Sequence, residues 1–340
     1  MEMANRWATN RNYQAAGKYT QADIDEWREG LAKDPNGMDN PYGVPNYLAY
    51  PSTQWVDELF LSTTSQKHNV SVVGSSENTN YLLSFGYLDN PGTLKNTGLK
   101  NYSGRINIET QITKFLKVGT QTYATFQTRE PGNTSFTYMY QNTPAVTPYH
   151  DGKYGVSVDG ASTSNLLADV MSRGGSYDDT RLNTTWYAKV NILDGLTAEA
   201  RFNYQTLFNE TATYSRKVDK QNFRTGEIIP GVSSSTATTS RATTRYQNHT
   251  NTATINYAKT FGKHDISILL GTEQYYWNVK GFSATRTGLL DLDLPDFAAA
   301  LDLLDPTLGG TAEQDYGVIS YFGRLNYAYK NRYLLEANFR

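Results

Sequence analysis

From about Lys67 to the end of the chain, apolar and polar residues alternate with a period of two over long runs. The run from Leu196 to Phe208 shows this pattern most clearly. Alternate positions of that run are apolar and the intervening positions are polar: Leu196, Ala198, Ala200, Phe202, Tyr204 and Phe208 against Thr197, Glu199, Arg201, Asn203 and Gln205. Runs 102–109, 184–192 and 321–330 repeat the pattern. A period of two predicts strands with one apolar face and one polar face.

The connections between these strands alternate between short and long. Asp194-Gly195 is a strong signal for a two-residue hairpin. Gly262-Lys263 and Lys330-Asn331 also lie between alternating runs. The long segments are expected at about 89–100, 130–181, 209–249 and 278–316. This order predicts roughly ten strands arranged as five hairpins.

The N-terminal region has a different pattern. Thr20 with Asp23 three residues later resembles a capping box, and Ile24, Trp27 and Leu31 follow at helical spacing. Several prolines come next. We therefore predict that residues 1–60 form an irregular segment with one short helix, and that residues 61–340 contain the strands.

Composition supports amphipathic strands and excludes several other classes. The mean hydropathy of the 340 residues is -0.59, yet 13% of them are aromatic. No apolar run is long enough for a transmembrane helix. The net charge of -2 gives no basic footprint for nucleic acid, and the absence of cysteine excludes disulfides and thiol chemistry.

Tight turns that alternate with long loops are typical of a membrane β-barrel, in which the two kinds of connection lie on opposite sides of the bilayer. Phe202 and Ile106 are then expected to face lipid, and Arg105, Glu199 and Arg201 to face the lumen. Aromatic residues are expected to form interfacial girdles, namely Trp186, Tyr204, Tyr276, Trp277 and Tyr327. The alternative is a soluble all-β protein in which the same aromatic residues pack in a core.

Several stretches resemble the SusC/RagA family of TonB-linked outer-membrane proteins. "YPSTQWVDELF" is similar to the stretch after the plug domain of that family, and residues 67–119 continue the similarity. "ISYFGRLNYAYKNRYLLEANFR" resembles another strand pair of the family. The fold class implied is all-β: a partial transmembrane antiparallel barrel of about ten strands, forming an open curved sheet, with one short N-terminal helix.

The resemblance also implies an internal fragment of a larger barrel. The plug and the TonB-contacting segment would precede residue 1, and further strands would follow residue 340. The implied function is import of large nutrients, glycans or peptides, across the outer membrane of a Gram-negative bacterium. The implied partners are a SusD-type lipoprotein lid, the TonB complex acting through the plug, outer-membrane lipid, and an oligosaccharide or peptide ligand.

Aromatic and polar residues are interleaved in the expected loop 133–155. Tyr138, Tyr140, Tyr149 and His150 are therefore candidate ligand contacts, since tyrosine faces pack on sugar rings and polar groups bond to hydroxyls. Mutual packing of these loop residues is the competing interpretation.

Catalytic motifs are absent from the sequence. The four histidines lack metal-binding spacing and no GxSxG motif occurs, so we expect no enzymatic activity, no cofactor and no metal site. A soluble surface adhesion or glycan-binding protein without a transport role remains the alternative function.

Overall fold

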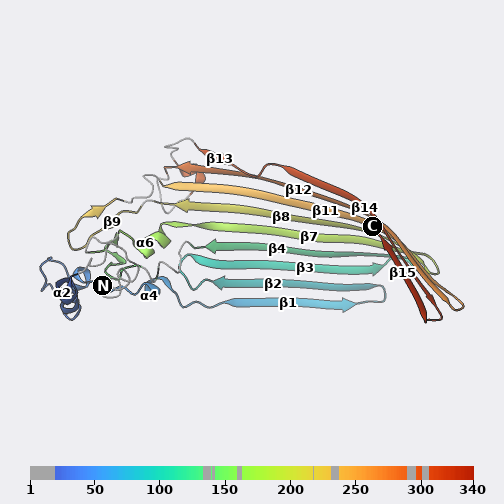
Figure 1. Cartoon of the computed structure of the whole chain (residues 1–340), viewed down its shortest axis with the longest axis horizontal. Coiled ribbons are helices and arrows are strands. Elements are labelled where there is room, and N and C mark those ends of the chain that lie inside the picture. Colours follow the sequence, from blue (N-terminus) through green and yellow to red (C-terminus); the bar gives the residue numbers. More distant parts are fainter. Residues whose placement is uncertain are drawn as a thin grey trace.

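The computed structural model describes residues 20–132, 139, 142–158, 163–216, 218–230, 237–288, 296–300 and 306–340. Within these ranges, long strands form one large sheet, and short elements gather beside one end of it (Figure 1). The elements of the large sheet are β1 (Gln66–Ser75), β2 (Thr79–Pro91), β3 (Thr97–Gln111), β4 (Leu116–Pro131), β7 (Arg173–Leu193), β8 (Leu196–Ser215), β11 (Thr238–Phe261), β12 (His264–Thr287), β13 (Thr307–Gly309), β14 (Gln314–Tyr329) and β15 (Tyr333–Phe339).

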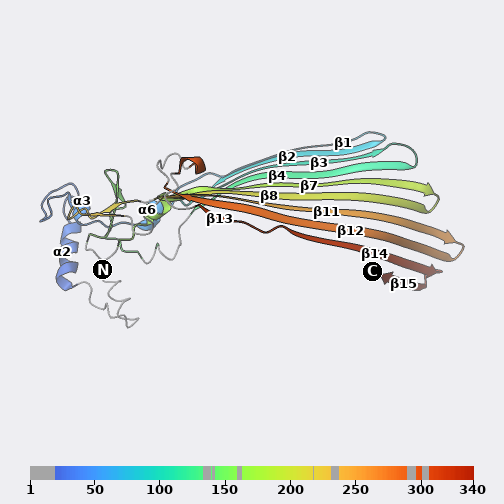
Figure 2. The ribbon, with the colours of Figure 1, turned by 90° about the horizontal axis from the view of Figure 1, so that it is seen from above.

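The order of strands in this sheet follows the chain. Ten strands pair antiparallel in the order β1-β2-β3-β4-β7-β8-β11-β12-β14-β15, and β13 pairs with β12. Strands β1 and β15 stand at the two ends of this order, so the described sheet is open. Figure 2 shows that the sheet is curved rather than flat. The predicted all-β class, the ten-strand order and the open sheet are confirmed.

The two ends of the sheet carry different connections. Tight turns, including Asp194-Gly195, Gly262-Lys263 and the turn after Tyr329, lie at one end (Figure 1). Gly262, the first residue of its turn, has a φ angle of 62°, and Lys330 and Asn331 have 51° and 53°, as primed hairpin turns require. In the Asp194-Gly195 turn only Gly195 is left-handed, with a φ angle of 79°. The long connections lie at the opposite end, as the alternation of turn lengths predicts.

The strands are longer than predicted at the end with the long connections. Strands β11 and β12 each contain 24 residues, whereas 9–11 residues span a bilayer when tilted. The expected loop 209–249 is therefore partly strand, and 89–100 shrinks to a short connection between Pro91 and Thr97. Cross-strand pairing continues here although the apolar alternation in the sequence fades.

Short elements form a second, smaller part of the structure. They are α2 (Gln21–Leu31), α3 (Asn46–Ala49), α4 (Trp55–Leu59), β5 (Tyr149–His150), β6 (Lys153–Gly155), α6 (Leu166–Met171), β9 (Lys220–Gln221), β10 (Ile228–Ile229) and the 3-10 turn η1 (Phe297–Ala299). Strands β10, β9, β6 and β5 form a small sheet. The prediction of a single short helix was therefore too low.

Helix α2 begins and ends close to the predicted positions. Thr20 caps it, since its side chain accepts a hydrogen bond from the backbone of Asp23 while the Asp23 carboxylate accepts one from the backbone of Thr20. Ile24 and Trp27 are buried as the spacing predicts. Leu31 is 47% exposed, because it lies at the end of the helix rather than on its packed face.

The cross-strand register separates the two faces of the sheet as predicted. Phe202 pairs with Trp186 and Arg201 pairs with Tyr187, so these two pairs project from opposite faces. Ile106 lies on the face of Phe202, and Arg105 lies on the face of Arg201. We call the first the apolar face and the second the polar face. Trp277 is a correction: it follows Tyr276, which is on the apolar face, and therefore lies on the polar face.

A close contact between β4 and β7 gives a test of this register. Gly119 pairs with Tyr187, and a Cβ added at Gly119 would lie 2.3 Å from the Tyr187 ring. The ring is held in place because the Tyr187 hydroxyl donates a hydrogen bond to Glu109 at 2.8 Å. Gly119→Ala is therefore expected to lower the free energy of unfolding by about 1–3 kcal/mol, measured by urea unfolding in detergent micelles.

Gly104 provides the matched control for this substitution. It also lies inside the sheet, but no atom lies within 4 Å of an added Cβ. Gly104→Ala should leave the unfolding midpoint nearly unchanged. Equal effects of the two substitutions would contradict the register.

Candidate functional site

Most of the buried apolar side chains lie outside the large sheet, with Val279 and Ala284 of β12 as exceptions. We define the loop module as the described residues of 20–61, 139–172 and 218–230. Two apolar clusters fill it: Trp55, Leu59, Leu94, Met139, Val146, Leu166, Leu167 and Val170 form one, and Trp27, Ala49, Tyr50, Ala145 and Val158 form the other. Leu94 comes from the β2–β3 connection, so the first cluster also contacts the sheet. Segments far apart in the sequence thus pack into one unit at the end with the long connections (Figure 2).

Arg224 joins two of these segments. Its guanidinium lies 5.0 Å from the ring centre of Trp27, 4.3 Å from that of Tyr42 and 5.0 Å from that of Tyr50. Its Nε donates a hydrogen bond to the carbonyl of Ala49 at 2.6 Å. Cation–π contacts of this kind stabilise by about 0.5–2 kcal/mol each. The 218–230 segment is thereby fixed to the N-terminal segment.

We call the three rings around the Arg224 guanidinium, those of Trp27, Tyr42 and Tyr50, the Arg224 cage. The hydroxyl end of Tyr42 is fixed as well. Its hydroxyl donates a hydrogen bond to Glu26 at 2.8 Å. Burial of the phenol, together with this hydrogen bond to a carboxylate, raises the pKa of Tyr42 to about 12. The phenol therefore remains protonated and bonded to Glu26 at every physiological pH.

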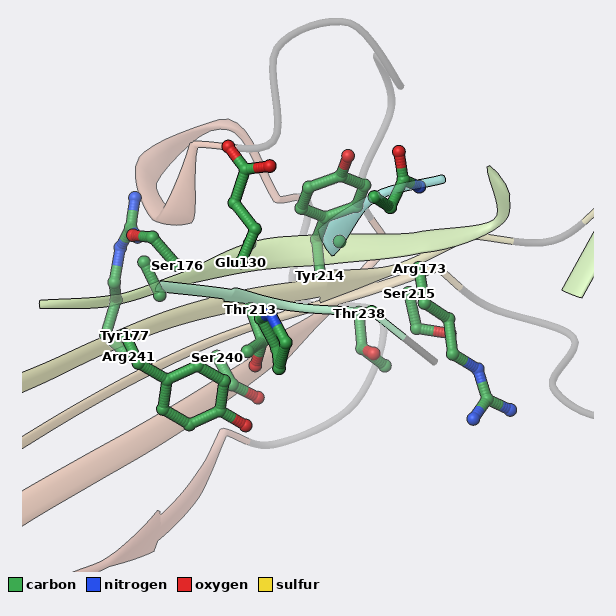
Figure 3. A pocket seen from close by; sticks show the side chains of 16 residues that line it. Glu130, Arg173, Ser176, Tyr177, Thr213, Tyr214, Ser215, Thr238, Ser240 and Arg241 are labelled. Carbon is green, nitrogen blue, oxygen red and sulfur yellow. The ribbon is translucent and has the colours of Figure 1, made fainter. Parts of the chain in front are cut away.

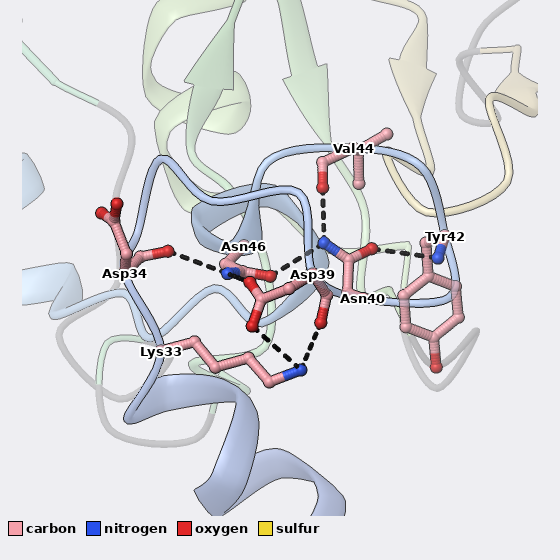
Figure 4. A network of polar contacts seen from close by, with 7 residues as sticks. All are labelled: Lys33, Asp34, Asp39, Asn40, Tyr42, Val44 and Asn46. Atoms are coloured by element: carbon pink, nitrogen blue, oxygen red, sulfur yellow. Dashed lines mark hydrogen bonds and ion pairs between the residues drawn. The ribbon is translucent and has the colours of Figure 1, made fainter.

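A network of polar contacts shapes the turn after α2 (Figure 4). The side-chain amide of Asn46 donates to the Asp34 carbonyl at 2.8 Å and to the Asp39 carboxylate at 2.6 Å. Asn40 donates to Asn46 at 2.8 Å, and Lys33 forms an ion pair with Asp39 at 3.7 Å. The hydrogen bond from Asn46 lowers the pKa of Asp39. This proline-rich segment is therefore ordered by side-chain bonds rather than by a helix or a strand.

Asn165 does the same for the 142–172 segment. This fully buried amide donates to the carbonyls of Pro148 at 2.8 Å and Gly155 at 2.9 Å, and its oxygen accepts from the Ala168 backbone at 2.9 Å. One side chain thus caps α6 and closes the loop that carries β5 and β6. A buried amide in this position fixes the loop conformation, because each bond would cost free energy if left unmade.

Two of the four candidate ligand residues, Tyr149 and His150, fall in this module. Tyr138 and Tyr140 lie outside the described residues. Tyr149 is 52% exposed, and its ring centre lies 4.9 Å from that of Tyr154. His150 contacts the rings of Tyr47 and Phe223, at 5.7 Å and 5.6 Å between ring centres. Tyr149 thus packs on Tyr154, whereas His150 packs on rings from two other segments, and as consecutive residues of β5 the two side chains project from opposite faces.

A cavity of about 670 Å³ lies where β4, β7, β8 and β11 approach the long connections (Figure 3). Most of its lining residues carry polar side chains, and the larger ones are Glu130, Arg173, Tyr177, Tyr214 and Arg241. By the cross-strand register, Arg173 and Tyr177 lie on the polar face of the sheet, whereas Glu130, Tyr214 and Arg241 lie on the apolar face, so these side chains do not converge on one ligand. Among the described residues, no group of three or more acidic or histidine side chains is placed to hold a metal ion.

Polar side chains bond to one another across the polar face. Glu109 accepts hydrogen bonds from Lys117 at 2.8 Å and from the Tyr187 hydroxyl at 2.8 Å. Asn203 donates to Asn183 at 2.9 Å and to Thr185 at 2.8 Å. This face therefore resembles the wall of a water-filled space rather than half of a packed core.

The apolar face exposes large hydrophobic side chains along nearly its whole width. Examples at 36–69% exposure are Val70, Val72, Tyr81, Leu83, Phe85, Tyr102, Ile106, Ile108, Phe126, Trp186, Phe202, Ile255, Ile268, Leu270, Ile319, Tyr321 and Leu325. Contiguous exposed apolar surface on this scale marks a face that contacts protein or lipid. None of the described helices is long and apolar enough to cross a membrane.

Aromatic residues on the apolar face follow a slanted line. Residues that face one another directly across neighbouring strands form a row. One row contains Tyr87, Tyr102 and Phe126, the last of which is on β4. A second row contains Tyr204, His249 and Tyr276, and its residue on β4 is Thr122. The second row thus lies four residues nearer the tight turns. An offset in this direction is expected if the strands are tilted, as they are by about 35–45° in membrane barrels.

Sequence comparison finds relatives for most of the chain. It is 24% identical over 310 residues to the TonB-dependent receptor P3 of Formosa agariphila, a match that covers 85% of this chain and 29% of that receptor. It is 23% identical over 327 residues to the TonB-dependent receptor SusC of Bacteroides thetaiotaomicron, covering 87% and 31%. The chain thus spans about 30% of the length of these relatives. No protein-family model matches it.

Structure comparison agrees. The RagAB peptide transporter superposes with a TM-score of 0.68 at 20% identity, covering 94% of this chain and 37% of that one. The fold is therefore that of part of a TonB-dependent-receptor barrel, a multi-pass barrel of the outer membrane. The chain is a homologue of the SusC/RagA-type TonB-dependent receptors.

The Arg224 cage gives a test of the loop module as a unit. Arg224→Met keeps the aliphatic stem but removes the charge, so it should loosen the N-terminal segment by about 1–3 kcal/mol. Hydrogen exchange in detergent should rise in both 20–60 and 218–230. Arg332→Met, in an exposed turn at the opposite end, is the matched control. Unchanged exchange in 20–60 would contradict the proposed linkage.

Proposed function

We propose that this chain forms part of the wall and part of the outer loops of a TonB-dependent transporter that imports large nutrients, either glycans or peptides. The observation that carries the proposal is the pair of contrasting faces on one long antiparallel sheet. An exposed apolar band suits lipid, and a hydrogen-bonded polar face suits an aqueous lumen. A soluble adhesion protein would have to cover the apolar band with a second layer.

In this proposal, residues 1–60 follow the plug and residues 61–340 provide barrel strands. The loop module lies on the outer side, where long loops of such barrels occur. A SusD-type lipoprotein lid contacts it, and the TonB complex acts through a plug segment. The role is transport rather than catalysis, since the chain's relatives are receptors.

Membrane extraction tests the proposal directly. The native gene product should remain with the outer-membrane fraction after aqueous washing and should require detergent for release. A lipoprotein should co-purify with it, and deletion of TonB should abolish uptake of its nutrient. The isolated 340-residue chain should be insoluble without detergent, because its apolar face and strand edges are exposed. A soluble monomer with a cooperative melt would contradict the proposal.

Tyr138, Tyr140, Tyr149 and His150 are proposed ligand contacts of the loop module. The exposure of Tyr149 supports this, since its side chain is open to solvent within the loop module. Substituting each residue with Ala in the native receptor should weaken ligand affinity about two- to tenfold, as expected for loss of a stacking ring. Tyr333→Ala, at the opposite end, is the control. Affinity unchanged at all four positions would eliminate this site.

A further inference from the structure

Basic side chains are concentrated on the polar face of four adjacent strands. On β3, β4, β7 and β8, this face carries seven basic residues: Arg105, Lys117, Arg129, Arg173, Arg181, Lys189 and Arg201. It carries three acidic ones: Glu109, Asp179 and Glu199. The whole chain has a net charge of -2, so this excess of positive charge is local.

Three of these arginines stack on tyrosine rings of the neighbouring strand. The guanidinium carbon of Arg129 lies 5.1 Å from the Tyr177 ring centre, and that of Arg105 lies 5.3 Å from the Tyr123 ring centre. Arg201 lies 5.1 Å from the ring centre of Tyr187. In each case the two residues are direct cross-strand partners. We call these three residues, Arg129, Arg105 and Arg201, the arginine ladder.

The ladder runs along the sheet from the loop module toward the tight turns. The rows of directly paired residues that contain Arg129, Arg105 and Arg201 include residues 129, 123 and 119 of β4, respectively. Ten residues of strand correspond to about 33 Å, which is close to the thickness of a bilayer core. Arg181, which pairs with Thr125, lies between the rows of Arg129 and Arg105.

The charges on Arg129 and Arg105, the two ladder arginines nearest the loop module, are not neutralised by the described carboxylates. Arg201 pairs with Glu199, and Lys117 pairs with Glu109. The ion pairs formed among described residues include neither Arg105 nor Arg129, and both side chains are exposed. A stacked guanidinium keeps its edge donors available, in a planar array that matches a carboxylate.

The side chains around the arginine ladder indicate which kind of anionic ligand fits this face. Between the three arginines, the polar face presents amides and hydroxyls, including Asn107, Gln121, Asn183, Thr185 and Asn203. On this face of the four strands, the leucine, isoleucine and valine side chains are Leu99 and Leu207 alone. Sugar hydroxyls match such a wall, whereas a mixed peptide would bring apolar side chains that find few partners.

We propose that the arginine ladder is a contact track for a carboxylated oligosaccharide. Carboxylates would bind the edges of Arg129 and Arg105 in turn, and hydroxyls would bond to the intervening amides. This inference rests on the proposed function, because it requires the polar face to line the transport path. It adds that the cargo is acidic and that its acid groups are recognised by the wall as well as by the loops.

Binding of a short oligogalacturonate to the native receptor tests the track, with its neutral methyl ester as the comparison. The acid should bind at least tenfold more tightly, and this preference should shrink at high salt. Arg105→Gln combined with Arg129→Gln should weaken binding of the acid tenfold or more while leaving the ester unchanged, as expected for lost charge-assisted bonds. Arg105→Lys with Arg129→Lys should retain part of the preference.

Arg324→Gln is the matched control, since Arg324 lies on the same face but on β14. The proposal would be contradicted if the acid and its ester bound equally well, or if Arg324→Gln weakened binding of the acid as much as the double substitution does. Tighter binding of a glutamate oligomer would overturn it in favour of an acidic peptide. A variant that only lowers the melting temperature of the cargo-free receptor would assign the arginines to the receptor's own packing. TonB-dependent uptake of neutral glycan alone would overturn the track but leave the proposed function standing.

Discussion

In hydrocarbon, every backbone amide and carbonyl must find its partner within the protein, and the rest of this structure depends on that constraint. The strands meet it by pairing with their neighbours along the chain over up to 24 residues, except at the outer edges of β1 and β15. Because successive side chains alternate between faces, the same ladder separates Phe202 from Arg201 and Ile106 from Arg105. The apolar band and the charged wall are therefore two consequences of one backbone arrangement.

The constraint also explains where the protein has a packed core. A sheet with lipid on one side and water on the other needs no second layer, so its side chains remain half-exposed. The long connections lie beyond the membrane and must pack to be ordered. Leu59, Val146, Val156 and Val170 are fully buried there, and Asn165 and Arg224 bond the segments together. The loop module is thus a small globular unit at the end of a sheet that has no globular core.

Local signals in the sequence predicted the parts of this fold that local physics decides. The Asp194-Gly195 turn, the Thr20 cap and the alternation around Phe202 each depend on residues close in sequence. Strand extension through residues 238–249 was missed, because beyond the bilayer no apolar face is required and the alternation fades. No local signal marks Arg224, since the rings that surround it belong to Trp27 and Tyr42, nearly 200 residues away in sequence. The tyrosine-stacked arginines needed the cross-strand register before their pairing was visible.

The central claim is that consecutive residues alternate between lipid and water. The sequence contains no cysteine, so single cysteines at 183–188 and 200–205 can report the environment of each position without background. A bilayer-embedded quencher should quench a probe at 186 or 202, and a membrane-impermeant maleimide should label 187 or 201, with a strict period of two along both strands. Uniform labelling at consecutive positions, or protection of both sets, would contradict the account.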